Sequence, residues 1–264
     1  MRPARRAWIA NALGVGIGVG FGFDAGAVGS LVATAALGLN QAPPPLAARY
    51  AVTVETVTPG PARSPGRAQS TDWYFFRDAG RIAVLKGAID ETWTRDAQGR
   101  IAFERTFHDH AKITDYSPGE LLTLGLAPDW AALATFVDAS ELAGLQLHSS
   151  RGRGAALRLR LEGRSGTDML RVDWLQALQL PALVLRRRTA HGRDGSDRSE
   201  VSIRIELLQH AATAPADWPQ PGLRAANYLH LDAADFGDMD YEPVVRLSEA
   251  LDVRRGWRQP HAHD

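Results

Sequence analysis

Apolar and polar residues alternate strictly in two segments of the chain, LRLRL at 157–161 and VSIRIEL at 201–207. A period of two places successive side chains on opposite faces of a β-strand. An antiparallel sheet with one face buried and the other in water requires this pattern. The pattern therefore predicts a mainly β protein, built on a curved antiparallel sheet or half-open β-barrel with an interior.

Strand-like segments follow one another along most of the chain. Turns such as DAG at 78–80 and DAQG at 96–99 separate them, because Asp tolerates and Gly prefers left-handed backbone. Strands are expected at 48–58, 72–77, 81–86, 88–95, 100–107, 112–116, 154–162, 169–175, 182–188 and 200–209. Residues 59–70 and 189–199 are expected to be loops, and 227–232 is either a last strand or the entry to a helix.

A short helical insert, predicted at 119–145, interrupts the strands. Ser117 is the predicted N-cap, Pro118 lies in the first turn, and Glu120 completes a capping box. A second helix is expected to begin after a cap at Asp129. Three of its apolar residues would share one face: Leu133, Phe136 and Val137. We expect the insert to act as a lid over the interior.

The beginning of the chain has the layout of an export signal. A basic start at 1–6 precedes an apolar stretch at 7–23, and small residues at 25–27 and 33–35 offer two cleavage sites. The alternative is an uncleaved membrane anchor. An export signal implies a periplasmic protein of the bacterial envelope.

Three parts are expected along the chain. Residues 1–45 are the export signal or membrane anchor plus a Pro-rich linker, and residues 46–214 are the β-barrel-like domain with its helical insert. Residues 215–264 are a C-terminal extension that packs on the barrel. This extension is expected to contain a helix at 242–251 with Pro243 at its first position.

Composition excludes several classes of function. The 264 residues contain no cysteine, so disulfides, thiolate metal sites and cysteine nucleophiles are absent. Thirty basic and thirty acidic residues cancel, which argues against nucleic-acid binding because that function needs a concentrated positive surface. Motifs of nucleophilic catalysis or phosphate binding are also missing. We therefore expect a protein without a cofactor and favour a non-enzymatic role.

Four short segments together form a recognisable pattern: WYFF at 73–76, ETWTRD at 91–96, GRI at 99–101 and DYSPGEL at 115–121. This pattern resembles the lipoprotein-carrier superfamily of bacterial envelopes, the LolA/LolB-like proteins. The resemblance covers about 50–209 and implies a half-open antiparallel barrel that short helices close and whose cavity takes acyl chains. The chain has no lipobox cysteine, so the membrane-anchored receptor form of the family is not expected.

Aromatic residues at alternating positions are the candidates for contact with a hydrophobic ligand. Tyr74 and Phe76 would face the other side of the sheet. The same residues also suit an ordinary filled core, which is the simpler interpretation. The candidate ligand-binding residues are Trp73, Phe75, Trp93, Phe103, Phe107, Tyr116 and Trp174.

Two other clusters suggest a metal site. His108 and His110 would point to the same face if they lay on a strand, although solvated histidines at a strand end are the alternative. The string DAADFGDMD contributes Asp232, Asp235 and Asp238, whose alternative role is to cap a short helix in a solvated loop. The terminal histidines at 261 and 263 also suit metal ions.

The primary hypothesis is an exported, non-enzymatic carrier or sensor that binds an acyl chain or another hydrophobic ligand. Its partners would be a hydrophobic small molecule or lipid and an envelope protein, with no nucleic acid. A metal-binding envelope protein and a structural interaction module with a filled core are the two alternatives.

Overall fold

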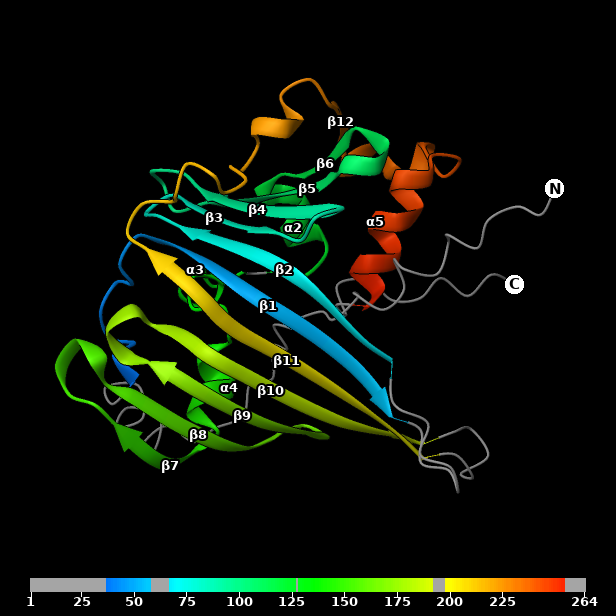
Figure 1. Cartoon of the computed structure of the whole chain (residues 1–264). Helices are drawn as coiled ribbons and strands as arrows, with labels where there is room; N and C mark the ends of the chain where they lie inside the picture. Colours follow the sequence, from blue (N-terminus) through cyan, green and yellow to red (C-terminus); the bar gives the residue numbers. More distant parts are fainter. Residues whose placement is uncertain (1–36, 58–66, 127, 192–197, 255–264) are drawn as a thin grey trace.

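A single open sheet of twelve strands forms the body of the protein (Figure 1). The computed structural model describes residues 37–57, 67–126, 128–191 and 198–254. The strand order is β12-β6-β5-β4-β3-β2-β1-β11-β10-β9-β8-β7, so β12 and β7 are the edges and the sheet does not close. This confirms the predicted mainly β class with a curved or half-open sheet.

Most neighbouring strands are antiparallel, and the parallel pair is β6 with β12. The strand bounds are β1 Leu46–Val57, β2 Arg67–Arg77, β3 Arg81–Leu85, β4 Ile89–Arg95, β5 Ile101–Phe107, β6 Lys112–Tyr116, β7 Gln146–Arg151, β8 Arg158–Ser165, β9 Asp168–Leu175, β10 Leu180–His191, β11 Arg198–Ala211 and β12 Leu229–Asp232. β1 lies between β2 and β11, which joins the early and late strands into one sheet.

Helices cover one face of this sheet, which we call the inner face. Three belong to the insert and one to the C-terminal extension: α2 Pro118–Thr123, α3 Trp130–Ala134, α4 Ala139–Ala143 and α5 Pro243–Arg254. Their apolar side chains join those of the strands in one core. The opposite face, the outer face, is partly covered by the segment that follows β11 (orange in Figure 1).

The start of the insert follows the predicted local chemistry. The Ser117 side chain accepts a hydrogen bond from the Glu120 backbone, and the Glu120 carboxylate accepts one from the Ser117 backbone. Asp129 caps α3 as expected. The prediction that Phe136 lies on this helix is wrong, because α3 ends at Ala134 and Phe136 has a left-handed backbone with φ of 64°.

Several predicted boundaries also change. β2 begins at Arg67, so the end of the expected loop at 59–70 is strand; residues 58–66 lie outside the described part. β10 and β11 extend into the expected loop at 189–199. Residues 154–156 form a 3-10 turn instead of a strand start, and 227–232 contains a strand.

Residues 1–36, most of the segment 1–45 predicted as export signal or membrane anchor plus linker, lie outside the described residues, as do the histidines at 261 and 263. Within the described residues, no helix combines the length and apolar character needed to cross a membrane. The described part of the predicted segment 1–45 contacts the sheet: Leu37 is buried, and its carbonyl accepts a hydrogen bond from Trp174.

Candidate functional site

The inner face gathers the aromatic side chains that the alternating pattern selected. All seven are buried in one core cluster: Trp73, Phe75, Trp93, Phe103, Phe107, Tyr116 and Trp174. Tyr74, at the intervening position, instead contacts Trp218 of the C-terminal extension, with ring centroids 5.4 Å apart. Contact between the seven buried aromatic residues and a ligand remains a prediction.

Phe136 of the insert occupies the middle of this aromatic face. Its ring stacks on Tyr50 with centroids 4.8 Å apart, and it meets Phe75 and Trp73 edge-on at 5.2 and 6.4 Å. A left-handed backbone at a residue other than glycine costs on the order of 1 kcal/mol or more, and the aromatic contacts offset this cost. The insert therefore fills the place where a ligand would contact these rings.

Two polar groups lie beside this aromatic cluster. The guanidinium of Arg77 donates to the backbone carbonyls of Ala134, Pro44 and Leu178 and so holds the end of α3 against the sheet. Burial lowers the pKa of Arg77 to about 10. Trp73 has the opposite situation: its indole Nε1 is buried, and no described residue accepts a hydrogen bond from it.

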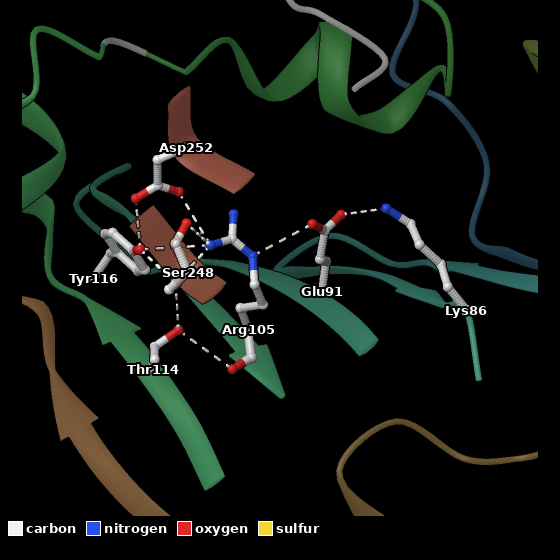
Figure 2. A network of polar contacts seen from close by, with 7 residues as sticks. All are labelled: Lys86, Glu91, Arg105, Thr114, Tyr116, Ser248 and Asp252. Atoms are coloured by element: carbon white, nitrogen blue, oxygen red, sulfur yellow. Dashed lines mark hydrogen bonds and ion pairs between the residues drawn. The ribbon is translucent and has the colours of Figure 1, made fainter. Parts of the chain in front are cut away.

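A charged network fixes α5 to the inner face (Figure 2). Arg105 of β5 is fully buried and donates to Asp252 at 3.0 Å and to the Ser248 hydroxyl at 2.6 Å. On its other side, Arg105 Nε lies 3.6 Å from Glu91, and Glu91 pairs with Lys86 at 2.6 Å. Two positive and two negative groups thus neutralise one another.

Tyr116 and Thr114 complete the network. The Tyr116 hydroxyl donates to Asp252 at 2.8 Å and lies 2.8 Å from the Ser248 hydroxyl. Thr114 lies 3.2 Å from the same hydroxyl. Burial raises the pKa of Tyr116, so this phenol stays neutral and acts as a hydrogen-bond donor. The network joins β4, β5, β6 and α5.

Sequence reasoning missed this network, although the strand period contains a signal for it. Phe103 and Phe107 were assigned to the interior, so Arg105 between them had to face inward as well. Glu91 likewise shares a face with Trp93. A charged residue at an inward position predicts a buried ionic partner, but nothing local identifies that partner as Asp252.

A pocket of about 380 Å³ lies on the outer face. Its floor comes from β2 to β6 and β12, and its roof is the segment 219–226 of the C-terminal extension. The ionisable lining residues are Asp72, Arg81, Asp90, Glu104, His108, Arg224 and His230. None of the seven inner-face aromatic residues lines this pocket. The sequence did not predict the pocket, because the segments that form its floor and its roof are far apart in the chain.

One wall of the pocket ties the roof to the floor. The His108 ring lies 2.6 Å from the Asp90 carboxylate and 3.2 Å from the Tyr228 hydroxyl. Burial raises the pKa of Asp90, while the hydrogen bond and charge of His108 act in the opposite direction. Burial, and then the charge of Asp115, raise the pKa of Glu104 on the floor.

The structure separates the residues of the predicted metal site. His108 and His110 lie on a 3-10 turn, so the strand argument for a shared face does not apply, and His110 is exposed. Asp232 caps the following 3-10 helix by accepting from the Ala234 backbone, whereas Asp235 and Asp238 are exposed. Among the described residues, no three His, Asp or Glu side chains converge in a way that would hold a metal ion.

Comparison with known proteins does not assign the chain to a family. No protein-family model and no curated protein sequence matches it.

Solved structures with a similar arrangement include PNGF-II, a putative outer membrane lipoprotein-sorting protein domain from Vibrio parahaemolyticus and a DUF1329 family protein from Desulfovibrio piger. Their identities are 11%, 8% and 7%, and their TM-scores are 0.33, 0.26 and 0.31. The aligned regions cover 74%, 66% and 74% of this chain and 33%, 88% and 95% of those chains. The chain thus spans a third of the length of PNGF-II.

Proposed function

We propose that the protein is a non-enzymatic carrier or sensor that binds an acyl chain or a similar hydrophobic ligand on its inner face. The observation that carries the proposal is Phe136, an aromatic plug that a short helical insert places among Tyr50, Trp73 and Phe75. Because this plug occupies the site, binding requires the insert to move and a ligand to replace Phe136.

The construction of the insert supports such a movement. Its helices have six, five and five residues, and isolated helices of this length are unstable without tertiary contacts. The insert is held by apolar packing, by the hydrogen bond from Arg77 to the Ala134 carbonyl and by the ion pair of Glu141 with Arg186 at 2.7 Å. All of these contacts can form again after a ligand leaves.

The surface of the inner face that is uncovered when the insert moves would also suit a ligand. Apolar rings would bury the chain of an acyl group, at roughly 25 cal/mol for each Å² of apolar surface. The indole N–H of Trp73, which has no acceptor among the described residues, would donate a hydrogen bond to an ester or carboxyl oxygen of the ligand. A site with apolar walls and one oriented donor is typical of lipid-binding cavities.

The test removes the plug without disturbing the backbone. Phe136→Gly suits the left-handed conformation at this position, since glycine adopts it without strain. Displacement of the dye 1-anilinonaphthalene-8-sulfonate by palmitate measures binding to the full chain. We expect palmitate to bind the wild-type protein and to bind the variant about tenfold more tightly, because no closing energy opposes it.

Leu122→Ala is the matched control, because Leu122 belongs to the same insert but is 68% exposed. This variant should bind palmitate like the wild-type protein. If palmitate displaces the dye neither from the wild-type chain nor from a folded Phe136→Gly variant, the inner face is a filled core and the protein is an interaction module.

The proposal also includes export to the envelope and, as a second partner, an envelope protein that delivers or receives the ligand. Cell fractionation of the full chain would locate the protein. Recovery in the cytoplasm alone would contradict the export part and leave the binding test unaffected.

A further inference from the structure

The outer-face pocket has a charge pattern that the inner-face function does not use. We propose that this pocket binds a small organic molecule through a single carboxylate group, with Arg81 as the main contact. The two sites lie on opposite faces of the same sheet, so each can be present without the other.

Most ionisable groups of the pocket already have partners. Asp72 pairs with Arg49 at 2.6 Å, Asp90 with His108 at 2.6 Å, and His230 with Asp115 at 2.7 Å. These pairs satisfy four of the seven ionisable lining residues. These four side chains are therefore already engaged by contacts within the protein.

The remaining three groups are Arg81, Arg224 and Glu104, which form no ion pair with any described residue. The Nε of Arg81 is also buried and has no hydrogen-bond acceptor in the described part of the chain. A buried donor without an acceptor is destabilising, and a bound oxygen would satisfy it. Among these three unpaired groups, two guanidinium groups and one carboxylate leave an excess of one positive charge.

This excess favours a ligand with one negative charge. A carboxylate accepts two parallel hydrogen bonds from a guanidinium fork. A phosphate ester carries up to two charges, and the second charge would face the Glu104 carboxylate across the same pocket. The charge count therefore selects a monoanion over a dianion.

The rest of the pocket defines the size and character of the ligand. A volume of about 380 Å³ lies at the lower end of the range for small-molecule sites. Leu85, Ile113 and Tyr74 provide an apolar part of the lining, which suits a hydrocarbon or aryl group. Glu104 would accept a hydrogen bond from a second polar group of the ligand.

The roof is shaped to reach Arg81. Gly222 has a left-handed backbone with φ of 77°, and a Cβ atom built there would lie 3.3 Å from an Arg81 terminal nitrogen. Glycine thus lets the roof approach the guanidinium closely while both keep their positions. Arg224, two residues further on, also lines the pocket, so the roof brings the second cation to it.

The experiment compares four probes with the same phenyl group in calorimetric titrations of the full chain. They are 3-phenylpropanoate, phenylalanine, 3-phenylpropanol and 2-phenylethyl phosphate. We expect saturable binding of the two carboxylates, with the alcohol and the phosphate at least about tenfold weaker. Tighter binding of phenylalanine would identify an amino acid as the source of the carboxylate, and tighter binding of 3-phenylpropanoate a simple organic acid.

Arg81→Gln should weaken binding of the carboxylates about tenfold or more, because the fork and the charge are both lost. Arg81→Lys keeps the charge, so its affinity for the carboxylates should lie between those of the wild-type protein and Arg81→Gln. It also provides a second variant if Arg81→Gln folds poorly. Arg164→Gln is the matched control, since Arg164 is an exposed arginine away from the pocket. Equal binding of the alcohol, tighter binding of the phosphate, no saturable binding of any probe, or an unchanged affinity in Arg81→Gln would overturn the proposal.

Discussion

Neighbouring charged residues on the two faces of strands β4 and β5 differ in whether they have ion-pair partners. Arg105 points to the inner face, where Asp252, Ser248 and Glu91 surround it. Glu104, the preceding residue, points to the outer face and lines the pocket without an ion pair to a described residue. Two consecutive residues of β5 thus belong to different environments, the buried network around Arg105 and the outer-face pocket.

The difference follows from the cost of removing a charge from water. A fully enclosed charge without a partner costs several kcal/mol, so the inner face surrounds Arg105 with acceptors and Arg77 with backbone carbonyls. The outer face remains close to solvent, where an uncommitted charge costs much less. Only the outer face can therefore keep charges available for a ligand.

The largest effect is expected from Arg105→Met. This substitution removes the cation that Asp252 contacts and one of the two cations near Glu91, which should lower the free energy of unfolding by about 3–5 kcal/mol. Urea denaturation monitored by circular dichroism measures the change. The matched control is Glu104→Gln on the other face, and a loss in Arg105→Met no larger than the change in this control would contradict the comparison.

A smaller loss is expected from Tyr116→Phe. The variant keeps the ring but removes the hydroxyl that contacts Asp252 and Ser248, which should cost about 1–3 kcal/mol in unfolding free energy. The same denaturation experiment applies. An unchanged midpoint would show that the hydroxyl is not needed to satisfy the Asp252 carboxylate.

On the outer face, Tyr228→Phe should loosen the roof more than the whole molecule. Loss of the contact with His108 should cost about 0.5–1.5 kcal/mol. Hydrogen exchange should become faster at 219–226, while exchange in β4 stays the same. Faster exchange in β4 as well would indicate that the roof and the sheet open as one unit.

The smallest effect, of opposite sign, is expected from Glu104→Gln. Because the folded pKa of Glu104 is raised, its carboxyl favours the folded state in acid, and this contribution is lost as the pH rises through the folded pKa. The variant should therefore equal the wild-type protein in acid and exceed it by less than about 1 kcal/mol at neutral pH. Thermal unfolding at a series of pH values tests this, and a variant less stable at neutral pH would contradict it.

Local chemistry predicts much of this fold. The alternation at 201–207, the capping box at Ser117 and the helix start at Pro243 all appear as expected. Each of these signals depends on residues that are close in sequence. The same reasoning correctly placed the aromatic residues on one face.

The pocket could not be predicted in the same way. It requires β12 to pair with β6 and the segment 219–226 to return over strands that begin near residue 72. These contacts join residues separated by more than a hundred positions, and no local pattern specifies them. The left-handed turn at Phe136, which ends α3 early, is also set by tertiary packing and not by helix propensity.

The position of α5 near the end of the described chain has a consequence for biosynthesis. Arg105 acquires Ser248 and Asp252 only after more than 140 further residues have been added. Before α5 is synthesised, this guanidinium lacks its contacts with Ser248 and Asp252. Full enclosure of Arg105 on the inner face must therefore await the synthesis of α5.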